Sequence, residues 1–374
     1  MLREMASVPQ PRGIMDSRRK GISLNKFRSV RGHRPAWIAW VSAAVWLGAA
    51  SATAGWAWAG DPPAQVQTLA FYRDGLDRAI EDKVSLGEPA IIDWQEHINR
   101  QFGQQVRPSP ASLEHPLVPR IRAMLAALPP RIHRLASRHV VAVYLLENDW
   151  GTGTTEAVQD DQGRWRYGYI ALNLSVLERT ANAWGSWKER SAFQPDPPAR
   201  IDMVLESEAA DTVDGALRFI FLHELGHVLG LALGVHGFWD AEPVPVETLD
   251  SPFVRLSWQP DGSGKLVSRW RERFPVLSQL HFYSFGEATL KASEAADVYR
   301  ALAQTDFPSL YAATNPYDDW AETFVVYVHT RMLGQPYRVS VTGGASGSSE
   351  YRSCMDVHGC PDKVAWVERY LAAP

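Results

Sequence analysis

Two histidines four residues apart, with a glutamate beside the first, stand in the apolar stretch of residues 219–230. Positions four apart lie on one face of an α-helix, so His223 and His227 can direct imidazole nitrogens at one metal ion, with Glu224 next to them. Zn²⁺ that keeps one coordination position open lowers the pKa of a bound water to about 7. Glu224 can take the proton of that water and pass it to a leaving nitrogen. The spacing therefore predicts a zinc hydrolase site.

One alternative is a buried helix that contains two histidines without a metal. Each buried polar side chain would then need a hydrogen-bond partner to offset a desolvation cost of about 1–3 kcal/mol. A second is an intramembrane protease, because residues 219–234 are strongly apolar. The apolar run is about 16 residues long, whereas about 20 are needed to span a bilayer. We therefore expect a helix in a globular core that carries a metal site.

A catalytic zinc site needs a third protein ligand, and the nearest candidates lie just downstream. Gly230 fits the glycine of the metzincin pattern, but Leu233 occupies the position where that pattern requires histidine. His236 follows nine residues after His227, which places it about half a turn away from the metal face of a continuing helix. It could return to the metal only if the helix ends at Gly234, so we expect an ordinary loop histidine.

A second group of acidic residues lies far along the chain, in residues 311–327. Pro316 suits the first turn of a helix, and Asp318 and Asp319 would lie near its positive end. Asp318 and Glu322 are four residues apart and so face the same way. One can bind the metal while the other accepts a hydrogen bond from a ligating histidine, as is common in zinc sites. The alternative, solvated surface charge, explains Asp319 better than this pair.

The two motifs together resemble those of the gluzincin metallopeptidases, which include thermolysin, and of the branch that contains the catalytic domain of anthrax lethal factor. In that branch the second helix reads approximately Tyr-x-x-Thr-Asn-x-x-Glu-x-x-Ala-Glu. Five residues of this chain fall on matching positions: Tyr311, Thr314, Asn315, Ala321 and Glu322. The resemblance covers residues 205–330. It implies an α+β fold with a zincin-like core: a small antiparallel sheet, an active-site helix with the His-Glu-x-x-His motif, and a second helix that bears a ligand.

The resemblance also implies a role for each matching residue. It implies Zn²⁺ ligands at His223 and His227, a general base at Glu224, an oxyanion-stabilising hydroxyl at Tyr311 and a hydrogen-bond acceptor for a ligand at Glu322. The glutamate that serves as the family's third ligand falls on Asp318. Aspartate is one methylene shorter, so its helix must approach the metal by about 1.5 Å more, or Glu322 is the ligand instead.

Composition and charge limit the partners. The chain has 374 residues, 45% hydrophobic with 15 tryptophans, enough for one large domain or two small ones. Residues 1–59 hold nine Lys and Arg against two acids, which leaves 29 basic and 40 acidic side chains in residues 60–374. The body after residue 59 therefore has a formal charge of -11. An acidic body argues against nucleic acid as a partner, whereas the resemblance implies a peptide or protein substrate.

Residues 1–59 have the pattern of a signal peptide or membrane anchor with a basic leader. A positive region in residues 18–34 precedes an apolar region in residues 36–50. Small-residue cleavage patterns follow, such as Ala57-Trp58-Ala59, before a polar break at Gly60. We expect export to the periplasm or the extracellular space. The alternative is a segment that stays uncleaved, since residues 37–58 are long enough to span and would anchor the chain to the membrane.

Cysteine usage agrees with export. Cys354 and Cys360 are the only cysteines, with five residues between them. In an oxidising compartment they would form a disulfide and close a small loop. His358 lies between them and makes a second metal site the alternative, but three ligands in a tight loop without a fourth favour the disulfide.

The remaining pattern predicts four regions: the leader of residues 1–59, a helical region in 60–136, the zincin-like core in 137–340, and residues 341–374 with a Gly/Ser loop, the cysteine loop and a C-terminal helix. Residues 139–146 and 169–176 read as strands, and the turn at residues 160–163 predicts antiparallel neighbours. Residues 266–273 and 288–302 have helical composition. The resemblance implies that an edge strand beside the zinc helix binds an extended peptide.

We therefore expect an exported zinc metallopeptidase that hydrolyses peptide bonds, with Glu224 as the general base. The first alternative is a catalytically inactive binding module that zinc stabilises, because a fold can keep its metal and lose turnover. The second is an amidase of cell-wall peptides that uses the same residues.

Overall fold

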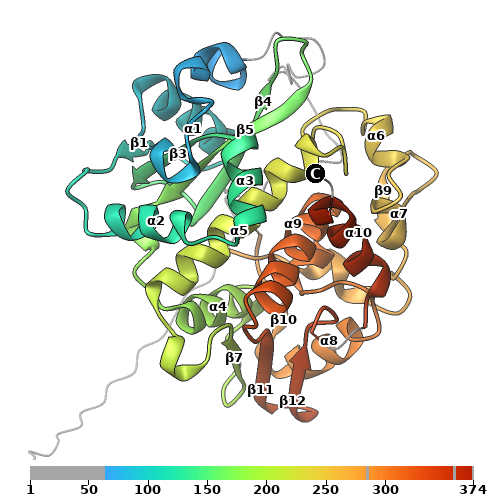
Figure 1. Ribbon diagram of the computed structural model, residues 1–374. Helices are drawn as coiled ribbons and strands as arrows, with labels where there is room; N and C mark the ends of the chain where they lie inside the picture. The colour runs from blue at the N-terminus through green and yellow to red at the C-terminus, as the bar shows by residue number, and fades with distance from the viewer. Residues whose placement is uncertain (1–63, 284–285, 357–358, 373–374) are drawn as a thin grey trace, which may run out of the picture. The chain divides into compact units, whose positions relative to one another are not determined.

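A five-stranded sheet forms one layer of the computed structural model, which describes residues 64–283, 286–356 and 359–372 (Figure 1). The strand order is β1 (Val84–Leu86), β3 (Val140–Glu147), β5 (Trp165–Asn173), β4 (Gly153–Gln159), with β2 (Ser109–Pro110) paired to β3. β1, β3 and β5 are parallel, whereas β4 runs antiparallel to β5. The described residues thus contain a mixed α and β fold with small sheets.

Helices cover both faces of this sheet, which explains the continuous apolar runs in β3 and β5. Tyr144 and Leu146 face a cluster that includes α1 (Pro89–Gln101). Val143 and Leu145 face the larger core, with α2 (Leu117–Ala126), α3 (Pro130–His139) and α5 (Val213–Ala232). A strand buried on both faces has no polar positions to alternate with apolar ones.

The two helices that carry the candidate site residues pack against each other. α5 begins after Thr212, whose side chain accepts a hydrogen bond from the backbone N–H of Gly215. It lies against β4 and β5 on one side and against α9 (Pro316–Tyr327) on the other (Figure 1). α9 begins at Pro316, as predicted, and continues into a π-helical turn at Val328–Met332.

The other elements surround α5 and α9. A three-stranded antiparallel sheet has the order β12-β11-β7, and two smaller sheets pair β10 with β6 and β8 with β9. The bounds of these elements are β6 (Phe193–Gln194), β7 (Arg200–Val204), β8 (Trp258–Pro260), β9 (Leu266–Ser268), β10 (Leu290–Lys291), β11 (Arg338–Gly344), β12 (Gly347–Arg352), α4 (Ala181–Arg190), α6 (Val246–Leu249), α7 (Val254–Ser257), α8 (Ala295–Leu302) and α10 (Pro361–Ala372). Short 3₁₀ helices are η1 (Gln65–Gln67), η2 (Leu69–Gly75), η3 (Ile80–Lys83), η4 (Leu174–Val176), η5 (Glu208–Ala210), η6 (Pro275–Gln279), η7 (Ala292–Glu294) and η8 (Tyr311–Ala313).

Cys354 and Cys360 are bonded, with their Cα atoms 5.3 Å apart. The bridge lies immediately before α10, which packs along α9 (Figure 1). The predicted C-terminal helix is present as α10. His358, which made a second metal site conceivable, lies outside the described residues.

Three local predictions were wrong. β3 and β5 are parallel neighbours, not antiparallel ones, because the turn at residues 160–163 joins β5 to β4, a strand that the sequence pattern did not reveal. Residues 266–273 contain β9 and turns instead of a helix, because the Asp261 side chain accepts backbone hydrogen bonds that close the β8–β9 hairpin. The Gly/Ser loop at residues 343–349 is the turn and start of the β11–β12 hairpin, where Gly343 and Gly347 have positive φ.

One region predicted from the sequence lies outside the residues that the structure describes. The predicted leader of residues 1–59 falls on positions that are not described. All the described residues belong to one compact unit. Among them, no helix combines the length and the apolar character needed to cross a membrane.

Candidate metal centre

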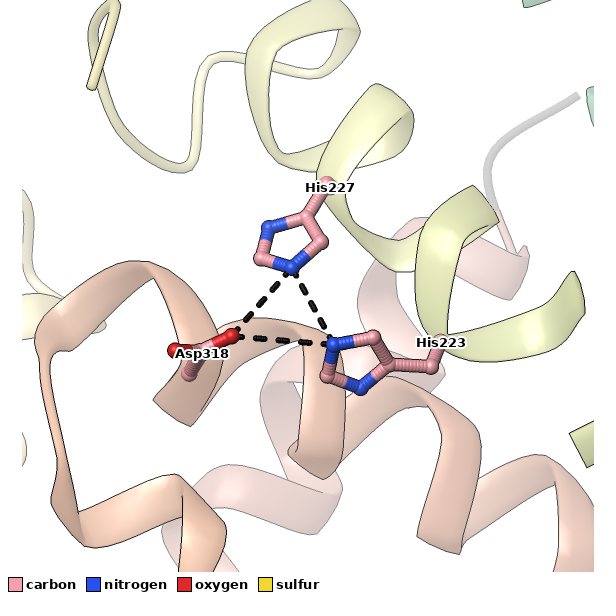
Figure 2. Close-up of side chains that lie close together, drawn as sticks. All are labelled: His223, His227 and Asp318. Atoms are coloured by element: carbon pink, nitrogen blue, oxygen red, sulfur yellow. Dashed lines mark hydrogen bonds and ion pairs between the residues drawn. The ribbon is translucent and has the colours of Figure 1, made fainter. Parts of the chain in front are cut away.

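His223, His227 and Asp318 converge in the described part of the chain on one point between α5 and α9 (Figure 2). The Nε2 atoms of the two histidines lie 3.2 Å apart. Asp318 Oδ1 lies 3.3 Å from Nε2 of His227 and 3.6 Å from Nε2 of His223. The sequence predicted these three residues from two motifs that are far apart in the chain, and the fold brings their donor atoms together.

The geometry of these three atoms fits a metal ion. Tetrahedral ligands at the usual zinc distances of about 2.0–2.1 Å lie about 3.3 Å from one another. Asp318 Oδ1 is buried, and the Nε2 atoms of the two histidines lie beside it. A metal ion at the point between these three atoms would compensate the charge of the buried oxygen. Two imidazole nitrogens and one carboxylate oxygen form a donor set that suits Zn²⁺.

Asp318 is held in place by the residues that begin α9. The side chain of Asn315 caps the helix by accepting hydrogen bonds from the backbone N–H groups of Tyr317 and Asp318. Its amide nitrogen also donates to Asp318 Oδ2 at 2.6 Å, and the hydroxyl of Thr314 lies 3.2 Å from the same oxygen. These contacts occupy Oδ2 and turn Oδ1 towards the histidines.

The short side chain of Asp318 reaches the histidines because α5 and α9 lie close together. Gly226 and Ala321 meet where the helices cross. The indole Nε1 of Trp320 donates a hydrogen bond of 2.9 Å to the backbone oxygen of Gly226. At this crossing the structure places Asp318, and not Glu322, in the group of three donor atoms.

Glu322 lies on the other side of His223 and outside the group of three donor atoms. Its Oε1 is 2.9 Å from Nδ1 of His223 and 3.0 Å from Nζ of Lys188 on α4. A carboxylate on the second ring nitrogen of a histidine fixes the orientation of the ring and frees Nε2 for a metal. Glu322 therefore has the position of a supporting acceptor.

The charges of this group reinforce one another. Burial by itself would lower the pKa of His223, but the carboxylates of Asp318 and Glu322 beside it raise the pKa to about 10. Burial would raise the pKa of Asp318, but the imidazoles of His223 and His227 hold it well below its usual range. Burial acts in the same direction on Glu322, but Lys188 and His223 lower its pKa to about 2. Both carboxylates are therefore anionic at neutral pH.

Glu224 faces β4 beside the metal ligands. Its Oε2 accepts a hydrogen bond of 2.7 Å from the hydroxyl of Thr155, which also lies 3.0 Å from the Glu224 backbone oxygen. At Gly153 on the same face of β4, an added Cβ would lie 3.3 Å from Glu224 Oε1. The carboxylate is thus confined between α5 and the strand, next to His223.

Tyr311 stands just before α9, in η8. Its ring centroid lies 5.6 Å from that of His223, and the side chain is buried. The rings of Phe282 and Tyr283 pack against it edge to face, and Nζ of Lys188 lies 4.7 Å from its centroid. The structure therefore places Tyr311 beside the first histidine, with its ring fixed by aromatic neighbours.

His236, which the sequence left as an alternative ligand, packs against Gly230 and lies outside the group of three donor atoms. The helix ends at Ala232, and Gly234 has a φ of 68°, so the chain turns back on α5. His236 Nε2 then lies so close to Gly230 that an added Cβ there would be 2.1 Å away. Gly230 therefore makes room for His236, as a packing contact within the core.

Two residues of the site were missed from the sequence. Thr155 lies in β4, whose Gly-Thr-Thr start gave no clear strand pattern, and Lys188 sits in a helix with unremarkable amphipathic composition. Their positions depend on packing between distant segments. Neither carries a local signal of its own.

Comparisons of this chain with protein-family models, with curated proteins and with solved structures found no match. The geometry of the site is therefore what bears on its function.

Proposed function

We propose that the chain is a zinc-dependent metallopeptidase of the gluzincin type, with a zincin-like core, that hydrolyses peptide bonds. The observation that carries this proposal is the triangle of His223 Nε2, His227 Nε2 and Asp318 Oδ1, with sides of 3.2–3.6 Å. Glu224 follows His223 directly, and its carboxylate accepts a hydrogen bond from Thr155 of β4. A zinc-binding triad with a carboxylate beside it is what metal-assisted hydrolysis requires.

Bound at these three residues, zinc would lower the pKa of a water in its open position and polarise a substrate carbonyl. Glu224 would serve as the general base, since its carboxylate can hold the proton of an attacking water and deliver it to the leaving nitrogen. Thr155 orients Glu224 through the hydrogen bond to Oε2. Glu322 Oε1, 2.9 Å from Nδ1 of His223, favours the tautomer of His223 that keeps the proton on Nδ1.

Tyr311 supplies the hydroxyl that stabilises negative charge developing on the carbonyl oxygen. Its place beside the His223 ring supports this role. The substrate is a peptide or protein, bound in extended form along β4. This strand ends the five-stranded sheet and runs past Glu224, so a peptide added to it would pass the general base.

We further propose that the enzyme acts outside the cytoplasm, in the periplasm or the extracellular space. The bonded Cys354 and Cys360 support an oxidising compartment. The predicted signal segment in residues 1–59 supports export, and membrane attachment follows only if that segment stays uncleaved.

The test is the full chain with Glu224→Gln, assayed for zinc content and for hydrolysis of a mixed peptide library. Glutamine keeps the shape of the side chain but cannot accept the proton, so the variant should keep one zinc per chain and lose at least about 100-fold in rate. Glu208→Gln, an exposed acid outside the site, serves as the matched control.

Any other result of this experiment rejects part of the proposal. A wild-type chain without zinc rejects the metal site. Zinc without hydrolysis in the wild type favours a zinc-stabilised binding module, and cleavage confined to cell-wall peptides identifies an amidase. Normal hydrolysis by Glu224→Gln rejects the general base.

A further inference from the structure

A buried lysine stands behind the candidate metal centre, on a helix that contributes no ligand. Lys188 on α4 has 2% of its side chain exposed, and its Nζ lies 3.0 Å from Glu322 Oε1. The rings of Trp184, Phe219 and Tyr311 surround the ammonium, with centroids 4.7–5.9 Å from Nζ. Lysine is almost never fully buried unless it is paired, so this site has a specific need for a positive charge.

That need comes mainly from Glu322, and the buried Glu189 next to Lys188 on α4 adds further negative charge. A single oxygen of the Glu322 carboxylate, Oε1, faces both Lys188 Nζ and His223 Nδ1, at 3.0 and 2.9 Å. Asp318 adds a second buried carboxylate on the other side of His223. Without a cation beside each carboxylate, Glu322 and Asp318 would be two uncompensated buried anions. An uncompensated buried charge is strongly destabilising.

We infer that Lys188 is a positioning residue that acts through Glu322: it balances the Glu322 charge independently of the metal, so that the supporting carboxylate and His223 keep their places whether or not the site is loaded. The inference rests on the metal site proposed above. A divalent ion provides its own compensation for the nearby carboxylates when bound. The lysine therefore contributes most to the chain that has not yet received its metal, and it lets folding precede metal uptake.

The experiment compares thermal unfolding of the full chain after treatment with EDTA and with saturating Zn²⁺. Lys188→Met keeps the length of the side chain and removes the charge. It should lower the Tm of the metal-free chain more than that of the zinc-loaded chain, so that the zinc-induced rise in Tm widens by about 5 °C or more relative to wild type. Adding Glu322→Gln to Lys188→Met removes both charges and should return the Tm of the metal-free chain to about its wild-type value.

The chain offers a matched control in a second buried lysine. Asp319 is fully buried and not the solvated surface charge expected from the sequence, because it pairs with Lys363 on α10 and accepts a hydrogen bond from Trp258. Lys363→Met should lower Tm equally with and without zinc, because this pair does not touch the metal group.

Equal losses with and without zinc in Lys188→Met would overturn the inference while leaving the metal site intact. So would a Lys188→Met chain that unfolds in both conditions and is not rescued by Glu322→Gln, since the lysine would then serve only packing. If wild-type Tm does not respond to zinc at all, the proposed metal site itself is rejected.

Discussion

Gly226 on α5 and Ala321 on α9 meet backbone to backbone, and a Cβ added at position 226 would lie 2.8 Å from the Cα of Ala321. No real Cβ contact is that short, so this pair sets the distance between the helix that carries the histidines and the helix that carries Asp318. The approach is what allows an aspartate to occupy a position where the resembling family has glutamate.

Gly226→Ala should therefore separate the donor atoms. The added methyl must push α9 away, because the atoms opposite it are backbone, and overpacking of this kind costs about 1–3 kcal/mol. We expect lower unfolding free energy in urea and loss of bound zinc. Gly262→Ala is the control, since no atom lies within 4 Å of an added Cβ there. A Gly226→Ala chain with wild-type zinc content would show that the crossing does not set the site geometry.

Asp318 can be tested through the length of its side chain. Asp318→Glu adds one methylene to a site built at close approach, so the carboxylate should overshoot and zinc affinity should fall about 10-fold. Asp318→Ala removes the ligand and should weaken binding further. Competition with a chromophoric chelator measures both. Affinity of Asp318→Glu equal to wild type would mean that α9 adjusts freely, and full affinity in Asp318→Ala would assign the third ligand elsewhere.

Thr155→Val removes one hydroxyl and keeps the shape of the side chain. Glu224 would lose its 2.7 Å hydrogen bond and its fixed orientation. We expect kcat to fall about 10-fold with unchanged zinc content, the effect of one hydrogen bond to a charged group. Thr154→Val, one residue away on the opposite face of β4, should leave kcat unchanged. If both variants behave alike, the hydroxyl of Thr155 has no role in orienting the base.

The sequence predicted the parts of the site that depend on local spacing. The four-residue interval of His223 and His227, the start of α9 at Pro316 and the pairing of Cys354 with Cys360 each follow from a local rule. Such rules need no knowledge of distant contacts.

The parts that were missed depend on contacts between distant segments. Asp318 and not Glu322 lies in the group of three donor atoms because of the way α5 and α9 cross, and Lys188 pairs with a carboxylate 134 residues away. The sequence did not predict β4, because its polar residues Thr155 and Glu156 are buried by tertiary partners. Their polar character hides the alternation of buried apolar and exposed polar residues that is expected of an edge strand. Tertiary packing determines these features, and local sequence patterns do not predict that packing.

The disulfide gives a prediction about stability alone. Replacing Cys354 and Cys360 with serine opens a short loop and should cost about 2 kcal/mol by the loop-entropy relation. The bridge lies at the start of α10 and does not touch the metal group, so zinc affinity should stay the same. Urea unfolding with and without a reductant measures the loss in the wild type. Loss of zinc on reduction would show that α10 is coupled to the site.

Zinc binding should depend on pH through His223. In the metal-free chain the adjacent carboxylates raise the pKa of this imidazole to about 10, so it carries a proton at pH 7 that zinc must displace. Affinity should rise as pH increases from 6 to 9. The stability of the metal-free chain should change in the opposite direction: the contribution of protonated His223 is fully present below its unfolded pKa of about 6.5 and is lost as pH rises through about 10. Titration calorimetry at pH 7 in buffers of different ionisation enthalpy should detect release of about one proton per zinc. Binding without proton release would contradict the charge arrangement derived for His223, Asp318 and Glu322.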